Sequence, residues 1–210
     1  MARTIVKVCG LTRLEDARAA LEAGADWLGF ILMGEGPRRV SPEQARSILD
    51  ALPGAVGVAV MVSPSPDEAR ELAIRAGVRR VQLHGVDAAS WPRDFPLPVT
   101  FVVPVAEDGA MLAPLPDKRD LVMLDTARGQ TSGGSGRTFP WFVAATVAAE
   151  FQVIVAGGLE GSNVEKMLDQ VRPFGVDASS RLEASPGIKD PDKVRRFIAA
   201  VRRHDTNRAT

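Results

Sequence analysis

This sequence of 210 residues has little from which to build a metal centre or a disulfide. It contains one cysteine, two histidines and no tyrosine, and its 26 basic and 26 acidic side chains leave a formal net charge of zero. A single cysteine excludes an internal disulfide and is typical of a reducing cytosol. The two distant histidines offer no zinc-type spacing, and a neutral balance argues against nucleic acid as a partner. We expect neither a bound metal nor a nucleic-acid partner.

Long hydrophobic runs are also missing. No apolar segment approaches the roughly 20 residues that a membrane span needs, and Met1 leads almost directly into a strand-like run. We therefore expect no signal peptide, no membrane contact and a cytoplasmic location. The length suits one domain, which we expect over residues 1–203, followed by a polar, frayed tail over residues 204–210. Both a monomer and a homodimer suit a domain of this size.

Short apolar runs alternate with helical patterns along the whole chain. The absence of polar alternation within these runs is typical of parallel strands covered on both faces. The expected strands are Thr4–Cys9, Trp27–Leu32, Val56–Val62, Arg79–Leu83, Val99–Val103, Leu121–Asp125, Val153–Ala156 and Gly175–Ala178.

This alternation predicts the α/β class and a single (β/α)8 TIM barrel. Because the stretch Pro104–Pro116 is rich in proline, we expect the outer helix after the fifth strand to be short or missing. The alternative is an open, doubly wound sheet, but no G-x-G-x-x-G follows the first strand.

Several helices carry clear start signals. Thr12-Arg13-Leu14-Glu15 predicts a capping box. Ser41, Ser65 and Asp190 are each followed by proline, which favours the first helical position. Gly77 marks the end of the third helix.

Two polar side chains end strands where a barrel carries its chemistry. Cys9 ends the inward column that begins with Ile5 and Lys7, and a helix start near Thr12 would favour its thiolate. Asp125 follows four apolar residues, so desolvation should raise its pKa and suit it to act as a general acid. The alternatives are a buried, inert cysteine and a carboxylate held in a salt bridge or a helix cap.

Turns at the last two strands indicate a phosphorylated small-molecule ligand. Gly157 and Gly158 follow the seventh strand, and Asp177, Ser179 and Ser180 end the eighth. Exposed backbone N–H groups in these two loops form the usual phosphate pocket of this fold. Either loop alone would be a weak signal.

Three further features lie in loops above the strands. Arg38, after the second strand, could hold a carboxylate or be a solvated surface charge. His84 ends the fourth strand and either lines the site or is a structural histidine. The stretch Gly133-Gly134-Ser135-Gly136 is a flexible loop that could close over a substrate.

Together these residues resemble a known family, the phosphoribosylanthranilate isomerases of tryptophan biosynthesis. The matching motifs occur in order over nearly the whole chain, which makes the resemblance specific. They are Lys7-Val8-Cys9-Gly10-Leu11-Thr12, Pro37-Arg38-Arg39-Val40, Gln82-Leu83-His84-Gly85, Leu124-Asp125-Thr126, Gly133-Gly134-Ser135-Gly136, Ala156-Gly157-Gly158-Leu159 and Val176-Asp177-Ala178-Ser179-Ser180.

The resemblance implies an aldose–ketose isomerase that needs no cofactor and no metal. Asp125 would protonate the ring oxygen of the substrate's ribose, and Cys9 would then remove the proton from C2 in an Amadori rearrangement. Arg38 would face the anthranilate end, and His84 would line the site. The implied phosphate contacts are Gly157, Gly158, Ser179 and Ser180.

The sequence departs from the family pattern at two positions. Arg39 stands where the family often has an aromatic residue, and Arg181 stands near the phosphate loop where glycine is common. Three other functions are possible. The related isomerase of histidine biosynthesis has an aspartate in place of Cys9, a Schiff-base aldolase would need a lysine such as Lys7 at the mouth, and a non-catalytic phosphate-binding barrel would need neither Cys9 nor Asp125.

Overall fold

The computed structural model describes residues 3–127 and 138–208. Eight parallel strands close into a barrel in which neighbours follow chain order and β1 also pairs with β8. The predicted (β/α)8 barrel is confirmed. Its strands are β1 (Ile5–Val8), β2 (Trp27–Met33), β3 (Gly57–Val62), β4 (Arg80–His84), β5 (Val99–Val105), β6 (Leu121–Thr126), β7 (Gln152–Val155) and β8 (Gly175–Ala178).

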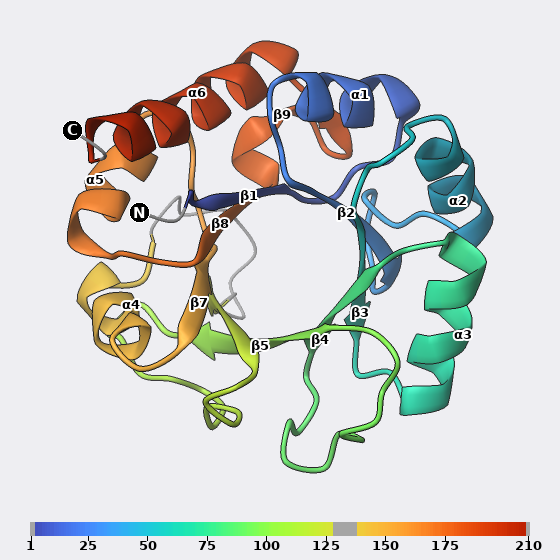
Figure 1. Ribbon diagram of the computed structural model, residues 1–210, viewed down its shortest axis with the longest axis horizontal. Coiled ribbons are helices and arrows are strands. Elements are labelled where there is room, and N and C mark those ends of the chain that lie inside the picture. Colours follow the sequence, from blue (N-terminus) through green and yellow to red (C-terminus); the bar gives the residue numbers. More distant parts are fainter. Residues whose placement is uncertain (1–2, 128–137, 209–210) are drawn as a thin grey trace.

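Helices surround the barrel as a ring (Figure 1). After β8 the chain first forms a 3-10 turn, η1 (Ser180–Leu182), and a small hairpin of β9 (Glu183–Ser185) and β10 (Ile188–Lys189). None of the described helices combines the length and the apolar composition that crossing a membrane needs. The helices are α1 (Leu14–Glu22), α2 (Pro42–Asp50), α3 (Pro66–Ala76), α4 (Trp141–Ala148), α5 (Val164–Gln170) and α6 (Pro191–Asn207).

The ring is interrupted between α3 and α4, where loops cover the barrel (Figure 1). Residues 106–120 connect β5 to β6 without an α-helix, which confirms the expected loss after the fifth strand. Residues 85–98, all described, also lack an α-helix, and the sequence pattern does not predict this second loss. Pro92, Pro96 and Pro98 oppose a helix there because proline lacks an N–H and restricts the residue before it.

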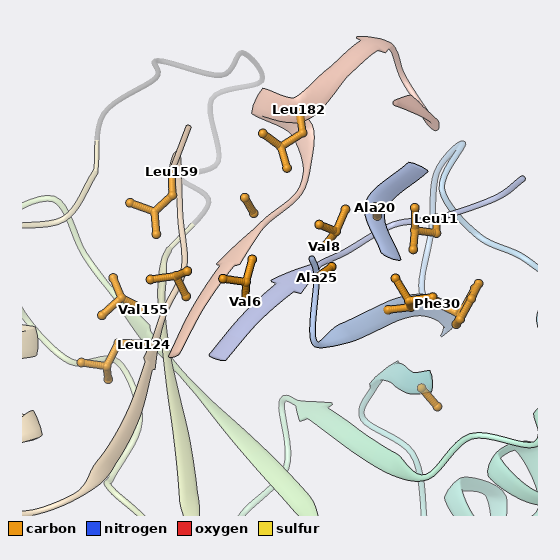
Figure 2. Packing of buried hydrophobic residues seen from close by; sticks show 14 of the residues in the cluster. Val6, Val8, Leu11, Ala20, Ala25, Phe30, Leu124, Val155, Leu159 and Leu182 are labelled. Atoms are coloured by element: carbon orange, nitrogen blue, oxygen red, sulfur yellow. The ribbon is translucent and has the colours of Figure 1, made fainter. Parts of the chain in front are cut away.

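Alternate side chains of the strands face two separate hydrophobic layers. On β1, Val6 and Val8 point outward into the large cluster between strands and helices (Figure 2). Successive side chains of a strand face opposite sides, so Lys7 lies inside the barrel. The buried members of the inner cluster are Trp27, Val58, Val102, Leu121, Met123, Ile154 and Ala156.

Most of the predicted helix starts are confirmed. Ser65 forms a complete capping box with Glu68, and the side chains of Ser41 and Asp190 cap α2 and α6. The capping box predicted at Thr12 is wrong. The Thr12 hydroxyl donates instead to the carbonyl oxygen of Gly187 over 2.6 Å, so α1 begins without a side-chain cap.

The expected frayed tail is also wrong for residues 204–207, because α6 continues through Asn207. His204 is buried, and its Nε2 lies 3.2 Å from Asp169 Oδ1. Asp205 Oδ1 accepts a hydrogen bond from the Thr4 hydroxyl over 2.6 Å, and Asp205 Oδ2 accepts one from the Thr4 N–H over 3.2 Å. These contacts join the end of the last helix to the start of the first strand.

Replacing Asp205 by alanine should destabilise the barrel. The variant leaves the N–H and hydroxyl of the buried Thr4 without their acceptor, so we expect a loss of about 1–3 kcal/mol in the free energy of unfolding. Urea unfolding followed by circular dichroism measures this loss. The control is Arg203→Ala, also on α6, which removes an exposed ion pair with Glu165 of α5 and should cost no more than ~0.5 kcal/mol. Equal losses in both variants would contradict the proposed anchoring.

Candidate active site

Cys9 and Asp125 both lie at the C-terminal end of the barrel. Cys9 directly follows β1 and is 6% exposed. Its N–H donates to the carbonyl oxygen of Ala178 over 2.9 Å, which fixes its position beside β8. Asp125 is the fifth residue of β6 and is partly exposed. Leu121 and Met123 belong to the inner cluster, so Asp125 ends the inward column of its strand. The predicted pair of polar groups therefore occupies one mouth on two separate strands.

The environment of Cys9 differs from the expectation for its thiol. Burial raises the pKa of the Cys9 thiol above its usual value, while the nearby Lys7 and Lys189 ammonium groups act to lower it. Burial therefore opposes the thiolate that the predicted helix start would favour. Desolvation is the largest effect, because an almost fully covered sulfur disfavours the charged state.

Arg38 reaches the same region but is held by a partner from the hairpin after β8. Its Nε and Nη2 donate to the two carboxylate oxygens of Glu183, each over 2.7 Å. Lys189 Nζ also donates to Glu183, over 3.0 Å. Burial would raise the pKa of the Glu183 carboxyl, but these two cations hold it below its usual range.

The turn at Gly10 shows that these groups converge beside Cys9. Gly10 has a φ of +72°, and a Cβ there would lie 2.9 Å from both Arg38 Cδ and Ser179 Oγ. The Ser179 hydroxyl donates to the carbonyl oxygen of Cys9 over 3.0 Å. Arg38, Ser179 and Cys9 are therefore neighbours, although they come from distant parts of the sequence.

The predicted phosphate residues separate into two groups. Gly157 and Gly158 turn with positive φ values of 87° and 71° after β7, and Ser180 is exposed at the start of η1. Asp177 lies deeper, because its Oδ1 accepts a hydrogen bond from Lys7 Nζ over 2.8 Å inside the barrel. The prediction that Asp177 holds phosphate needs correction, since a carboxylate that is buried and ion-paired repels an anion and offers it no donor.

His84 ends β4, where it was predicted to face the mouth. The Gln82 side-chain Nε2 lies 2.9 Å from Nε2 of His84, and Gln82 is buried. Both residues occupy the inward face of the strand, as their spacing predicts. The predicted lid stretch at residues 133–136 lies outside the described residues.

Sequence reasoning missed three residues of this site. Gly29 on β2 leaves room for the thiol, because a Cβ there would lie 2.9 Å from Cys9 Sγ and 3.1 Å from Lys7 Cε. A glycine inside an apolar strand indicates such a close approach, so this signal was present in the sequence. Glu183 and Lys189 carry no comparable signal, since only the hairpin brings them to Arg38.

Comparisons with known proteins show the family to which this chain belongs. The family model described as N-(5'phosphoribosyl)anthranilate (PRA) isomerase matches residues 6–200. A relative from Syntrophus aciditrophicus, named N-(5'-phosphoribosyl)anthranilate isomerase, is 39% identical over 99% of this chain and 91% of its own. The chain belongs to the phosphoribosylanthranilate isomerase family.

Solved members of this isomerase family share the fold. The phosphoribosylanthranilate isomerase of Thermotoga maritima is 34% identical, with a TM-score of 0.84 over 95% of this chain and 98% of its own. A structure of a phosphoribosylanthranilate isomerase in complex with reduced 1-(o-carboxyphenylamino)-1-deoxyribulose 5-phosphate is 32% identical, with a TM-score of 0.80 over 95% and 98% of the two chains. A third, at 32% identity, a TM-score of 0.77 and the same shares of the two chains, is a monomer generated from the dimeric enzyme of T. maritima.

Two hollows of this isomerase are lined by other residues. A cavity of about 360 Å³ lies at the opposite end of the barrel, where Arg80, Val99 and Leu121 begin β4, β5 and β6. Arg181 lines a groove between α6 and the turns after β7 and β8. Among residues 3–127 and 138–208, no group of three or more His, Cys, Asp or Glu side chains could hold a metal ion.

A methyl group at Gly157 should disturb the glycine turn after β7. Its Cβ would overlap Thr126 Oγ1 and lie 2.7 Å from the Thr126 backbone nitrogen, whereas a Cβ at Gly54 would meet nothing within 4 Å. The two φ values are +87° and +88°. The left-handed backbone alone costs roughly 1–2 kcal/mol in each alanine variant. Crowding should add at least ~1 kcal/mol to the loss in Gly157→Ala. Urea unfolding of both variants measures the difference, and equal losses would show that the turn has room for a side chain.

Proposed function

We propose that this chain converts N-(5-phosphoribosyl)anthranilate into 1-(o-carboxyphenylamino)-1-deoxyribulose 5-phosphate by an Amadori rearrangement. Membership of the isomerase family supports the reaction, and a solved relative binds the reduced form of this product. The observation that carries the residue assignment is the position of Cys9 and Asp125. Each ends the inward column of a different strand at the same mouth.

Asp125 acts as the general acid and Cys9 as the general base. The Asp125 carboxyl gives its proton to the ribose ring oxygen, the C1–O bond breaks, and the nitrogen lone pair forms a Schiff base with C1. The Cys9 thiolate then removes the proton from C2, which gives an enolamine. Tautomerisation of the enolamine yields the ketose without any net oxidation. General acid and base catalysis of this kind contributes about 10²–10⁴-fold each.

The substrate's phosphate binds across the turns after β7 and β8. The backbone at Gly157, Gly158 and Ser180 is accessible there, and the Ser179 hydroxyl already orders this loop through Cys9 O. Asp177 has no phosphate contact in this proposal. The charge of the phosphate dianion is instead met by backbone N–H groups, which need no counter-ion of their own.

Arg38 and His84 bind the other end of the substrate. Arg38 keeps its bidentate contact with Glu183, which raises the pKa of the guanidinium and fixes its orientation. A guanidinium has five donors, so those not used by Glu183 are left for the anthranilate carboxylate. His84 lines the same mouth from β4.

The first test compares the decay of phosphoribosylanthranilate fluorescence in wild type, Cys9→Ser and Asp125→Asn, with substrate generated in situ. We expect each variant to lose at least ~100-fold in kcat, the usual weight of a general acid or base. The control is Asp120→Asn, which changes a carboxylate at the opposite end of β6 that pairs with Arg93 over 3.0 Å. It should turn over at nearly the wild-type rate. A folded wild type that binds the substrate without converting it would indicate a binding protein.

The pH dependence of kcat/KM gives a second test. Only the thiolate can remove the C2 proton, and burial raises the pKa of Cys9. In the wild type, Asp125 must be protonated in the same form, so the two ionisations change kcat/KM in opposite directions. Asp125→Asn removes the second ionisation, and its residual kcat/KM should rise with pH until the Cys9 thiol is ionised. A profile of this variant that is flat across neutral and mildly alkaline pH would contradict the assignment of Cys9 as the base.

A further inference from the structure

A buried ion pair lies directly beneath the proposed catalytic thiol. Lys7 is 1% exposed, and its ammonium donates to Asp177 Oδ1 over 2.8 Å. The two residues are register partners on the adjacent strands β1 and β8, so closure of the barrel itself brings them together. Both side chains are buried, and the acid–base steps proposed above use neither.

Lys7 and Cys9 lie on the same inward face of β1, and both side chains pack against Gly29 of β2. They lie two residues apart on the same face of β1. A Cβ at Gly29 would lie 2.9 Å from Cys9 Sγ and 3.1 Å from Lys7 Cε. The absence of a side chain at Gly29 therefore lets the lysine stem and the sulfur pack against the same point of β2, which places the ammonium within electrostatic reach of the thiol.

Four charged groups act on the sulfur, counting Lys7 and Asp177, and the contacts of each group limit its effect on the thiol. Lys189 and Arg38 both act on Cys9, but both are bound to Glu183. Asp177 faces the thiol from β8 and opposes its ionisation. Lys7 is the cation with the strongest influence on the thiol. Burial lowers the pKa of Lys7, but the charges of Asp177 and Cys9 outweigh this, so the amine stays protonated and is not a nucleophile.

We propose that Lys7 is a positioning residue that stabilises the Cys9 thiolate, and that Asp177 holds Lys7 in place and limits that stabilisation. The inference rests on the proposed role of Cys9 as the base. In the active form Asp177 and Cys9 are anions and Lys7 is a cation. When the thiolate takes the proton from C2 it becomes a neutral thiol, and Lys7 and Asp177 remain as a neutral pair. Before the transfer these three groups carry one net negative charge, and the proton from C2 neutralises it.

The chain allows this proposal to be tested by direct titration of one thiol. It contains one cysteine and no tyrosine, so the ultraviolet absorbance of the thiolate reports Cys9 without interference from a phenolate. The titration needs no substrate and no reagent that must reach the buried sulfur. Wild type is compared with Lys7→Met, Asp177→Asn and the double variant that carries both changes, with folding checked by circular dichroism at each pH.

The two single variants should move the thiol in opposite directions. Lys7→Met removes the cation and leaves Asp177 as a repelling anion, so the ionisation constant of Cys9 should fall at least ~10-fold, or one pKa unit. Asp177→Asn frees the ammonium from its competing partner, so the thiolate should appear at lower pH than in wild type. The double variant leaves no lone buried charge, and should lie between wild type and Lys7→Met.

Both variants break the same ion pair, so a purely structural role would shift the thiol in one common direction. Shifts of the same sign, or a Lys7→Met thiol that titrates like wild type, would overturn the proposal. If Lys7→Met does not fold, the double variant decides, since its thiol must still titrate above wild type. The matched control is Asp26→Asn, which breaks a partly buried pair with Arg202 near the other end of β1 and should leave the thiol unchanged.

Activity then separates this proposal from the proposed function. In an Asp125→Asn background, adding Lys7→Met should move the rising limb of the residual kcat/KM profile to higher pH by the same amount as the thiol titration, with KM little changed. Opposite shifts of the thiol in an enzyme without isomerase activity would leave the ion-pair role intact and reject the function. An active isomerase whose thiol titration does not shift in either variant would keep the proposed function and reject the role of the ion pair.

Discussion

Closure of the barrel between β1 and β8 is the constraint on which the site depends. It sets the register that places Lys7 beside Asp177 and the Cys9 N–H on Ala178 O. Two charges buried this deeply are tolerated only as a well-formed pair, because each alone would carry a large desolvation penalty. The pair also fixes β1 relative to β8 just below the mouth. A structural requirement of the fold and the electrostatic environment of the thiol therefore share the same two side chains.

The hairpin after β8 extends this arrangement outward. Glu183 binds Arg38 and Lys189 together, and Lys189 Nζ also donates to the carbonyl oxygen of Ser179 over 3.1 Å. Ser179 in turn bonds Cys9 O. Because every one of these groups is held by at least one neighbour, the mouth is ordered before any substrate arrives. Such preorganisation is what acid–base catalysis requires, since proton transfer depends on short, aligned contacts.

Much of the fold and part of the site could be predicted from the sequence. Period-two alternation identified the inward face of β1 and the position of Cys9, and Asp125 was identified as the residue that ends an apolar run. Proline after serine or aspartate marked three helix starts correctly. Two of the errors share one cause, which is that a distant partner replaced the contact that the local pattern predicts. Thr12 bonds Gly187 instead of capping α1, and Asp205 bonds Thr4 instead of ending in a frayed tail.

The sequence by itself determined which residues form strands, which of their faces point inward, and which polar groups end at the mouth, because these follow from local periodicity and turn chemistry. Tertiary structure alone decided how those groups are paired and charged. The pairing of Asp177 with Lys7 spans 170 positions of the chain, and that of Arg38 with Glu183 spans 145. The direction in which burial moves the pKa of Cys9 also depends on atoms from several strands. Electrostatic energies depend on distance and desolvation in space, which no local pattern of residues contains.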